Sequence, residues 1–296
     1  MGIIWELDFY SRPILDEKNK KIWEVILCES PLNIHRESLF QYSQYCSSKE
    51  VNSVKLRQVL EEAISQAGKA PSQIRFFRRQ MKNMITKACQ ELDIQAVPSR
   101  RTIALNQLLE ERSKEVYPQE TGYDPQAVPS ARAGPPTLRS YQPPIPQRLP
   151  DALMPKQWAF VSLTAGDLQE MSEWDISFGE AFPMPQEVTA ETPIPGVILF
   201  SPRALPMAGW MSGIELAFLK FIPESPAKLI LETGASDSWI LANLKNKQLI
   251  TEAAGFESAK QEAQQIHFLA VQSDPQSQSF AGFWLLQELH AQGTLR

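Results

Sequence analysis

A proline-rich stretch in the middle of the sequence constrains the fold most strongly. Between Tyr117 and Pro155 the chain holds ten prolines and few large aliphatic side chains. Because proline fixes φ and lacks an N–H, neither a helix nor a central strand continues through such a run. The sequence therefore predicts a semi-rigid, extended linker at 117–155, which separates an N-terminal domain (1–116) from a C-terminal domain (156–296).

The composition fits two globular domains that need no cofactor. The chain has 296 residues, and 43% of them are hydrophobic, which is enough for a core in each domain. No apolar run approaches the roughly 18 residues that a membrane-spanning helix requires. Three cysteines without C-x-x-C spacing and one nearby histidine, His35, do not indicate a zinc site. We therefore expect no metal, no cofactor and no membrane span.

The two domains differ in charge. Residues 1–116 hold 18 Lys and Arg against 15 Asp and Glu, a net charge of +3. Residues 156–296 hold 8 against 16, a net charge of −8. A polyanionic partner is therefore expected to meet the N-terminal domain.

Strand and helix patterns alternate in the N-terminal domain in the order β-β-β-α-β-α-β-α. Period-two runs predict a hairpin first, and helical spacing with Gly68 and Thr102 as boundary residues places the helices. The predicted elements are 3–10, 21–28, 39–45, 51–64, 74–77, 81–92, 94–97 and 102–116. A hairpin sheet continued by crossover units is an α/β layer fold, and this order resembles the ribonuclease H-like fold.

That resemblance raises a nuclease hypothesis, which the residues support only in part. Nucleases of this fold hold two metal ions with carboxylates on the first strand, the first helix and near the end of the fourth strand. Asp8 lies on the first predicted strand, and Glu61 or Glu62 lies on the first helix. The fourth-strand position instead carries arginines at 78 and 79. The sequence favours an inert or repurposed version over an active nuclease.

The same arginines belong to the strongest binding signal in the chain. Seven Lys and Arg fall between Arg75 and Arg101, with only Glu91 and Asp93 as acids and two phenylalanines interleaved. Guanidinium groups pair with phosphates and stack on bases, and aromatic rings stack on the bases of single strands. A solvated helix face with core phenylalanines is the alternative explanation. The predicted RNA-binding residues are Arg75, Phe77, Arg78, Arg79, Lys82, Arg100 and Arg101.

The C-terminal domain is predicted to be mixed α/β as well. Strands are expected at 158–163, 196–200, 228–233, 266–271 and 280–286, and helices at 209–221, 238–244 and 257–264. The sequence contains no glycine-rich phosphate loop, H-E-x-x-H motif or nucleophile elbow. We therefore expect no catalytic residues in this domain.

Several aromatic-rich segments of both domains resemble one family. It comprises the RNA-binding translation factors for the B-type reaction-centre protein of photosystem I, found in green algae, plants and cyanobacteria. The segments are 5–14 with 21–24, 76–81, 98–102, 174–179 and 280–286. The resemblance implies binding to A/U-rich single-stranded RNA and a role in the synthesis and assembly of photosystem subunits, without catalysis. No transit peptide is recognised before Ile3, which fits a cytoplasmic cyanobacterial protein or a processed protein of the chloroplast stroma.

Together these arguments predict a two-domain, non-enzymatic α/β protein that binds A/U-rich single-stranded RNA and promotes translation or assembly of photosystem subunits. Two alternatives remain open at this point. One is a metal-dependent nuclease that uses Asp8 with Glu61 or Glu62. The other is a scaffold whose acidic domain docks onto ribosomal or thylakoid-associated proteins.

Overall fold

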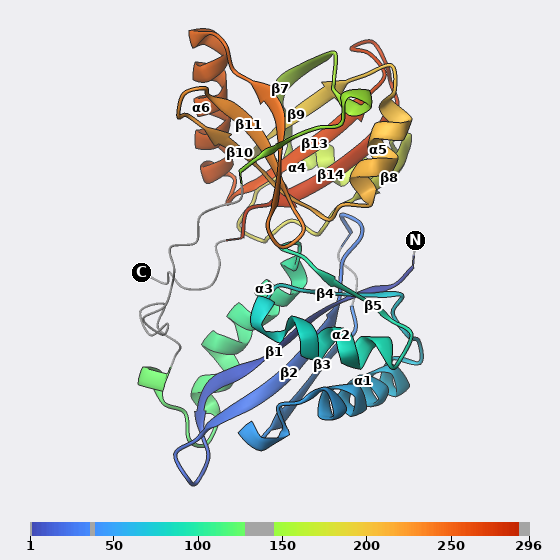
Figure 1. Ribbon diagram of the computed structural model, residues 1–296. Helices are drawn as coiled ribbons and strands as arrows, with labels where there is room; N and C mark the ends of the chain where they lie inside the picture. The colour runs from blue at the N-terminus through green and yellow to red at the C-terminus, as the bar shows by residue number, and fades with distance from the viewer. Residues whose placement is uncertain (1, 36–38, 128–144, 290–296) are drawn as a thin grey trace. The chain divides into compact units, whose positions relative to one another are not determined.

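The computed structural model describes residues 2–35, 39–127 and 145–289 (Figure 1). The chain divides into two compact units. Among the described residues, unit 1 comprises 2–30, 39–127 and Leu289, and unit 2 comprises 31–35 and 145–288. Both units combine helices with mixed sheets, so the α/β prediction is confirmed. Among the described residues, no helix is both long and apolar enough to span a membrane.

Unit 1 is built on a five-stranded sheet in the order β3-β2-β1-β4-β5. The first three strands are antiparallel neighbours, whereas β4 and β5 run parallel to β1. The strands are β1 (Ile4–Leu15), β2 (Lys21–Glu29), β3 (Gln41–Cys46), β4 (Gln73–Phe76) and β5 (Gln95–Pro98). The helices are α1 (Ser53–Ala67), α2 (Lys82–Gln90) and α3 (Ile103–Glu111), with a π-helical turn at Arg112–Val116. The predicted order of elements in this domain is thus the observed one.

The two faces of this sheet are chemically different. On one face Trp5, Leu7 and Phe9 of β1 join a hydrophobic core that includes buried side chains of α1 and α2. Side chains alternate along a strand, so Glu6 and Asp8 point to the opposite face, and both are buried. That face packs against α3 through a smaller apolar cluster of β2 and α3 residues. One face is therefore apolar, and the other carries buried charge.

Part of the predicted linker is folded. Tyr117 is buried, and the following residues bond to the first strand, since the N–H of Leu15 donates to the carbonyl of Gly122 at 2.8 Å and the N–H of Asp124 donates to that of Pro13 at 3.0 Å. Pro118 and Pro125 lie in the first turns of short 3-10 helices, where a missing N–H costs nothing. The structure therefore extends the N-terminal unit to residue 127.

The far end of the predicted linker is folded too. Residues 147 and 148 form a short strand, β6 (Gln147–Arg148), on the edge of a sheet of unit 2, and Leu149 after it is buried. Prolines flank this strand instead of interrupting it. The centre of the predicted linker, 128–144, lies outside the described residues.

Unit 2 contains a five-stranded sheet, β7-β9-β13-β14-β8, and a four-stranded sheet, β10-β11-β12-β6. A shared hydrophobic core joins both sheets to α5 and α6. The remaining strands are β7 (Gln157–Thr164), β8 (Ile176–Glu180), β9 (Pro193–Phe200), β10 (Leu216–Ile222), β11 (Lys228–Thr233), β12 (Asp237–Asn243), β13 (Ile266–Gln272) and β14 (Phe280–Gln287). The helices are α4 (Ala165–Gln169), α5 (Ala204–Ser212) and α6 (Lys247–Glu262). Short 3-10 turns of the two units lie at Ser48–Glu50, Arg79–Met81, Tyr117–Gln119, Pro125–Ala127, Asp151–Leu153 and Met171–Glu173.

Two helix predictions in this unit are wrong. The helix predicted at 209–221 ends at Ser212, and the apolar residues after Gly213 form strand β10 instead. The residues predicted as a helix at 238–244 form strand β12, which pairs with β11 around a tight turn in which Gly234 has φ of 52°. An apolar run without clear periodicity suits a buried helix or a buried strand equally, and here the hairpin turn decides for the strand.

Candidate nucleic-acid interface

The parallel pairing of β4 and β5 brings two arginine pairs to the same end of the sheet. Phe76 lies opposite Pro98, and the N–H of Ser99 donates to the Phe76 carbonyl at 2.9 Å. Arg78–Arg79 follow β4, and Arg100–Arg101 follow β5 at the equivalent distance. Since the carboxyl ends of parallel strands meet at one edge of a sheet, the backbones of both pairs lie at that edge. We call Arg78, Arg79, Lys82, Arg100 and Arg101 the basic edge.

The predicted RNA-binding residues differ in their exposure. Arg79 and Lys82 are exposed, and Arg100 is partly exposed. Phe77 is half-buried, and the side chain of Arg78 is 19% exposed. Arg75 and Arg101, in contrast, are buried. The seven residues therefore form an accessible group and an internal pair.

The internal pair, Arg75 and Arg101, acts electrostatically on the buried Glu6. The Glu6 carboxylate accepts hydrogen bonds from the Ser30 hydroxyl at 2.6 Å and from the N–H of Leu105, in the first turn of α3, at 2.7 Å. Burial raises the pKa of Glu6 to about 7, although these hydrogen bonds and the charges of Arg75 and Arg101 oppose the rise. The side chain of Thr102, at the N-cap position, makes no capping bond. A strand carboxylate therefore anchors the start of α3, directly after Arg101.

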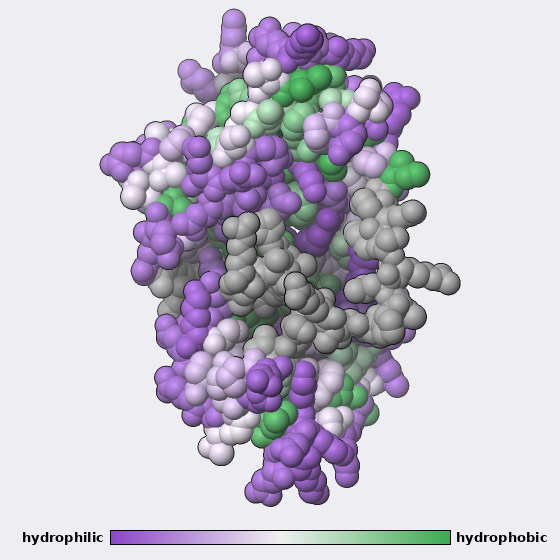
Figure 2. Space-filling model, turned by 90° about the vertical axis from the view of Figure 1, so that its left-hand side faces the viewer, coloured by the Kyte–Doolittle hydropathy of each residue, from purple (hydrophilic) through white to green (hydrophobic). Residues whose placement is uncertain are grey.

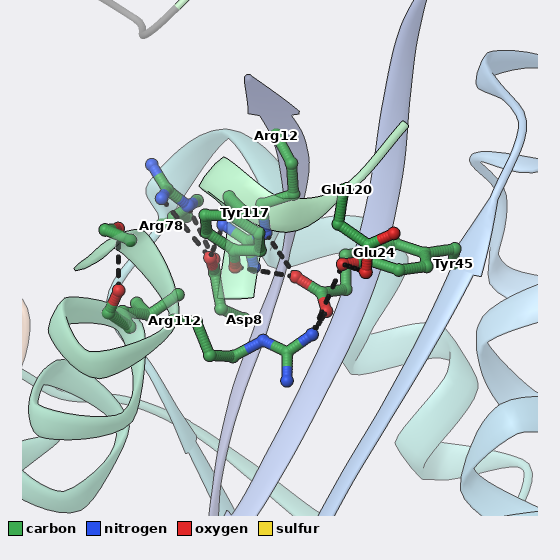
Figure 3. Close-up of polar contacts among 10 residues, drawn as sticks. Asp8, Arg12, Glu24, Tyr45, Arg78, Arg112, Tyr117 and Glu120 are labelled. Carbon is green, nitrogen blue, oxygen red and sulfur yellow. Dashed lines mark hydrogen bonds and ion pairs between the residues drawn. The ribbon is translucent and has the colours of Figure 1, made fainter. Parts of the chain in front are cut away.

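Asp8 holds two guanidinium groups on the same face of the sheet (Figure 3). Its buried carboxylate accepts from Nε of Arg78 at 2.5 Å and from Nη2 of Arg78 at 3.3 Å. Nη1 of Arg12 lies 3.0 Å from its Oδ2. A carboxylate that accepts two donors from one guanidinium fixes the plane of that group, so Asp8 determines how Arg78 is oriented.

Glu24 continues this network on β2 (Figure 3). Its carboxylate accepts from Nε of Arg12 and from the hydroxyl of Tyr117, each at 2.7 Å, and is ion-paired with Arg112. Burial is the main cause that raises the pKa of Tyr117 above its ordinary value. The network connects β1, β2 and the segment after α3, so one ionic cluster covers the middle of the charged face.

The carboxylates of the nuclease hypothesis do not come together. Asp8 faces α3, whereas Glu62 on α1 accepts a hydrogen bond at 3.0 Å from Tyr42, which packs into the core on the opposite face. Glu61 lies 3.8 Å from Arg57 within the same helix. Among the described residues, no group of three or more His, Cys, Asp or Glu side chains is arranged to hold a metal ion. Asp8 is therefore a counterion to arginine in this fold.

The sequence interpretation missed the partners of the arginines. The sequence pattern predicts Asp8 only as a metal ligand and does not predict Tyr10 or Tyr117 as site residues. Both Glu6 and Asp8 alternate with buried apolar side chains along β1. Two buried acids on the same face of a strand require cations nearby. This alternation of acidic and apolar residues along β1 is the sequence signal that identifies Glu6 and Asp8 as partners of arginines.

Comparisons with known proteins agree across both units. Residues 4–112 match the family model described as "RNA-binding protein Tab2/Atab2 N terminal", and residues 136–287 match the model of its C-terminal domain. The chain is 38% identical to "Protein TAB2 homolog, chloroplastic" of Arabidopsis thaliana over 96% of its own length and 74% of the relative's. It is 36% identical to the protein of the same description from Zea mays, over 96% of its own length and 71% of the relative's. No solved structure matches the chain, so the likeness to ribonuclease H stays a prediction. The chain belongs to the Tab2/Atab2 family of RNA-binding proteins.

Proposed function

We propose that this protein binds A/U-rich single-stranded RNA at the basic edge and thereby promotes translation or assembly of photosystem subunits, without catalysis. The observation that carries the proposal is the pairing of β4 with β5, which gathers the cations after both strands at one edge. Membership in an RNA-binding family supports the ligand class. The resemblance described above supplies the A/U preference and the photosystem role.

In this proposal the accessible cations contact phosphates. The accessible cations are Arg79, Lys82 and Arg100, which are at least partly exposed. Their contacts position the RNA strand but do not distinguish one base from another, because only contacts to the bases read the sequence. Arg75 and Arg101 act from inside the fold, where they balance Glu6 and support the start of α3. The bases of an unpaired strand then remain available for stacking and edge contacts.

The test is the salt dependence of RNA binding. Replacement of Arg79, Lys82 and Arg100 by alanine is expected to lower the slope of log affinity against log salt by roughly 0.7 per lost phosphate contact. A matched variant removes three exposed lysines elsewhere in unit 1, at positions 18, 20 and 49, and changes the net charge equally. The two variants should differ clearly. Equal slopes would show that general charge, and not the basic edge, attracts RNA.

The proposal also divides the RNA contacts between the units. The sequence surplus of cations lies in residues 1–116, and the −8 charge of residues 156–296 repels a phosphate backbone. Ultraviolet crosslinking of the whole protein to a labelled A/U-rich strand should therefore mark peptides from residues 75–101. Crosslinks concentrated in peptides of unit 2 would contradict the assignment.

The absence of catalysis and the cellular setting are further parts of the proposal. The ion pairs of Asp8 favour a binding role over metal-assisted hydrolysis, so the protein should leave RNA and RNA–DNA hybrids uncut in the presence of magnesium or manganese. Cleavage that disappears in Asp8→Asn would reverse this conclusion. The plant relatives are described as chloroplastic, and we place this protein in the chloroplast stroma or a cyanobacterial cytoplasm.

A scaffold role finds less support from the described surface. Large exposed hydrophobic side chains lie on different elements, with Val54 on α1 and Leu205 on α5. On the face shown in Figure 2, hydrophobic residues form separate patches among hydrophilic ones. Ribosomal or thylakoid-associated proteins remain a secondary part of the proposal.

A further inference from the structure

We propose that Tyr10, Phe77 and Arg78 form a nucleobase-binding site within the RNA surface, and that Asp8 is the positioning residue of this site. The inference rests on the proposed RNA-binding function. It adds a division of labour, in which the accessible cations of the basic edge contact phosphates and Arg78 contacts a base. Asp8 and Tyr10 were not among the residues that the sequence predicted to bind RNA.

The planar guanidinium of Arg78 lies against two aromatic rings at this site. The guanidinium carbon of Arg78 lies 3.7 Å from the centroid of the Tyr10 ring and 4.8 Å from that of the Phe77 ring. At the shorter distance the guanidinium and the ring are in stacking contact. Tyr10, Phe77 and Arg78 are all partly exposed. The cluster therefore presents planar, polarisable surface to solvent, which suits the π-face of any base.

Asp8 fixes the orientation of the guanidinium. Nε and Nη2 of Arg78 both donate to its carboxylate, at 2.5 and 3.3 Å. The carboxylate is itself held by Arg12 and fully buried, whereas the Arg78 side chain is partly exposed. An arginine held in this way loses little further side-chain freedom when a ligand binds. The ion pair therefore preorganises the exposed part of the group.

The remaining chemistry of Arg78 suits a base better than a phosphate. Asp8, which it shares with Arg12, offsets part of its positive charge, so its attraction for a phosphate is weakened. Nη1 makes no hydrogen bond to any residue that the structure describes and offers two donors beside the stacked rings. Unpaired bases present carbonyl and ring-nitrogen acceptors along their edges. A stacked guanidinium whose charge is partly offset, and whose Nη1 has no hydrogen-bond partner among the described residues, is therefore suited to bind the edge or the face of a base.

The experiment compares two single strands that carry the same charge. One is an A/U-rich RNA, and the other is a strand of equal length made of abasic residues. The full-length protein is titrated with each strand, as are the variants Arg78→Lys, Tyr10→Leu and Asp8→Asn. Arg57→Lys serves as the matched control, since Arg57 lies on α1, is partly exposed and is not part of the basic edge.

We expect Arg78→Lys to weaken binding of the RNA roughly tenfold, as loss of one stacked base does, and to leave binding of the abasic strand and the salt slope unchanged. Lysine keeps the charge but not the planar group. Tyr10→Leu should act in the same direction. Asp8→Asn should lower the preference for RNA over the abasic strand, because the guanidinium loses its orientation. Arg57→Lys should change neither affinity.

The outcomes separate this inference from the proposed function. Equal weakening for both strands in Arg78→Lys would assign Arg78 to phosphate and overturn the nucleobase site, while RNA binding itself stands. Failure of the unmodified protein to bind either strand would overturn both. If Arg78→Lys fails to fold, Tyr10→Leu decides, because it leaves the ion pair of Arg78 with Asp8 intact. An unchanged preference for RNA in Tyr10→Leu would then contradict the site.

Discussion

The two units bury charge in different ways. Among its described residues, unit 1 buries six Asp, Glu and Arg side chains on or beside one face of its sheet, namely Glu6, Asp8, Arg12, Glu24, Arg75 and Arg101. In unit 2 the two sheets and two helices share a large apolar core, and the buried ionisable side chains among its described residues are Lys260 and His267. A buried ion pair is seldom more stable than an apolar contact of the same size. The buried ion pairs of unit 1 therefore orient side chains more than they stabilise the fold, on the sheet face next to the basic edge.

The few buried ionisable groups of unit 2 brace secondary structure. Nζ of Lys260 donates to the carbonyl of Leu219 at 2.9 Å and to Glu288 at 2.7 Å. His267 accepts from the N–H of Leu219 at 2.8 Å through Nε2, which assigns its proton to Nδ1, 2.9 Å from the Gln265 carbonyl. These bonds tie β10 to β13 and α6. Their role is structural, in contrast to the cluster around Asp8.

The largest expected effect tests whether the ionic cluster of unit 1 is a single structural element. Glu24→Ala leaves Arg12, Arg112 and Tyr117 without their shared acceptor inside the fold. Removal of one partner from a buried ion pair costs about 3–5 kcal/mol. Hydrogen exchange measured by mass spectrometry should show lost protection in peptides of β1 and β2 and unchanged protection in β13 and β14.

The control for this variant is an exposed pair of the same unit. Glu110, near the end of α3, and Lys114, in the turn after it, lie 2.6 Å apart on the surface, and Glu110→Ala should cost less than about 0.5 kcal/mol. A small effect of Glu24→Ala, or equal loss of protection in both units, would mean that the units do not differ in the way described.

The next effect concerns unit 2 and acidic pH. Burial, with a smaller contribution from nearby Lys260, lowers the pKa of His267 to about 3. The unfolded chain binds this proton near pH 6.5 and the folded chain does not, so stability is lost as the pH falls from 6.5 toward 3. Between pH 7 and pH 4 the loss is about 3 kcal/mol. The free energy of unfolding of wild type and of His267→Gln, measured with denaturant at several pH values, should therefore differ in its slope against pH between pH 7 and pH 4. Equal slopes for the two proteins would contradict this prediction.

The smallest of the three effects has the opposite sign and lies in unit 1. Burial raises the pKa of Glu6 to about 7, so the folded chain holds a proton that the unfolded chain releases near pH 4.5. Its contribution to stability is complete below pH 4.5 and is lost as the pH rises through 7. From pH 5 to pH 7 the loss is about 2 kcal/mol.

Glu6→Gln isolates this contribution. The variant loses one acceptor for Ser30 or Leu105, which shifts its stability by a constant amount at every pH. Only a change with pH in the stability difference between wild type and the variant reports the titration of Glu6. If the difference between wild type and Glu6→Gln does not change between pH 5 and pH 7, Glu6 is ionised throughout by Arg75 and Arg101.

Local patterns predicted much of the fold. In unit 1 the period-two runs and Gly68, which has φ of 67° at the end of α1, give every strand and helix in order. In unit 2 the strand at 228–233 coincides with β11. Prediction failed where a run is apolar on all sides, at 209–221, because burial from every direction removes the periodicity that separates helix from strand.

The sequence by itself predicted a region that could meet RNA, since a surplus of cations with interleaved aromatic rings is visible in the order of residues alone. It also determined the alternation that sends Glu6 and Asp8 to the face opposite Trp5 and Leu7. Only the tertiary structure decided that Asp8 pairs with Arg78. It also decided that Arg75 and Arg101 are buried while Arg79 is exposed. The physical reason is that ion pairing and burial depend on which strands become neighbours. The pairing of β1 with β4 brings Asp8 next to Arg78, which lies 70 positions later in the chain.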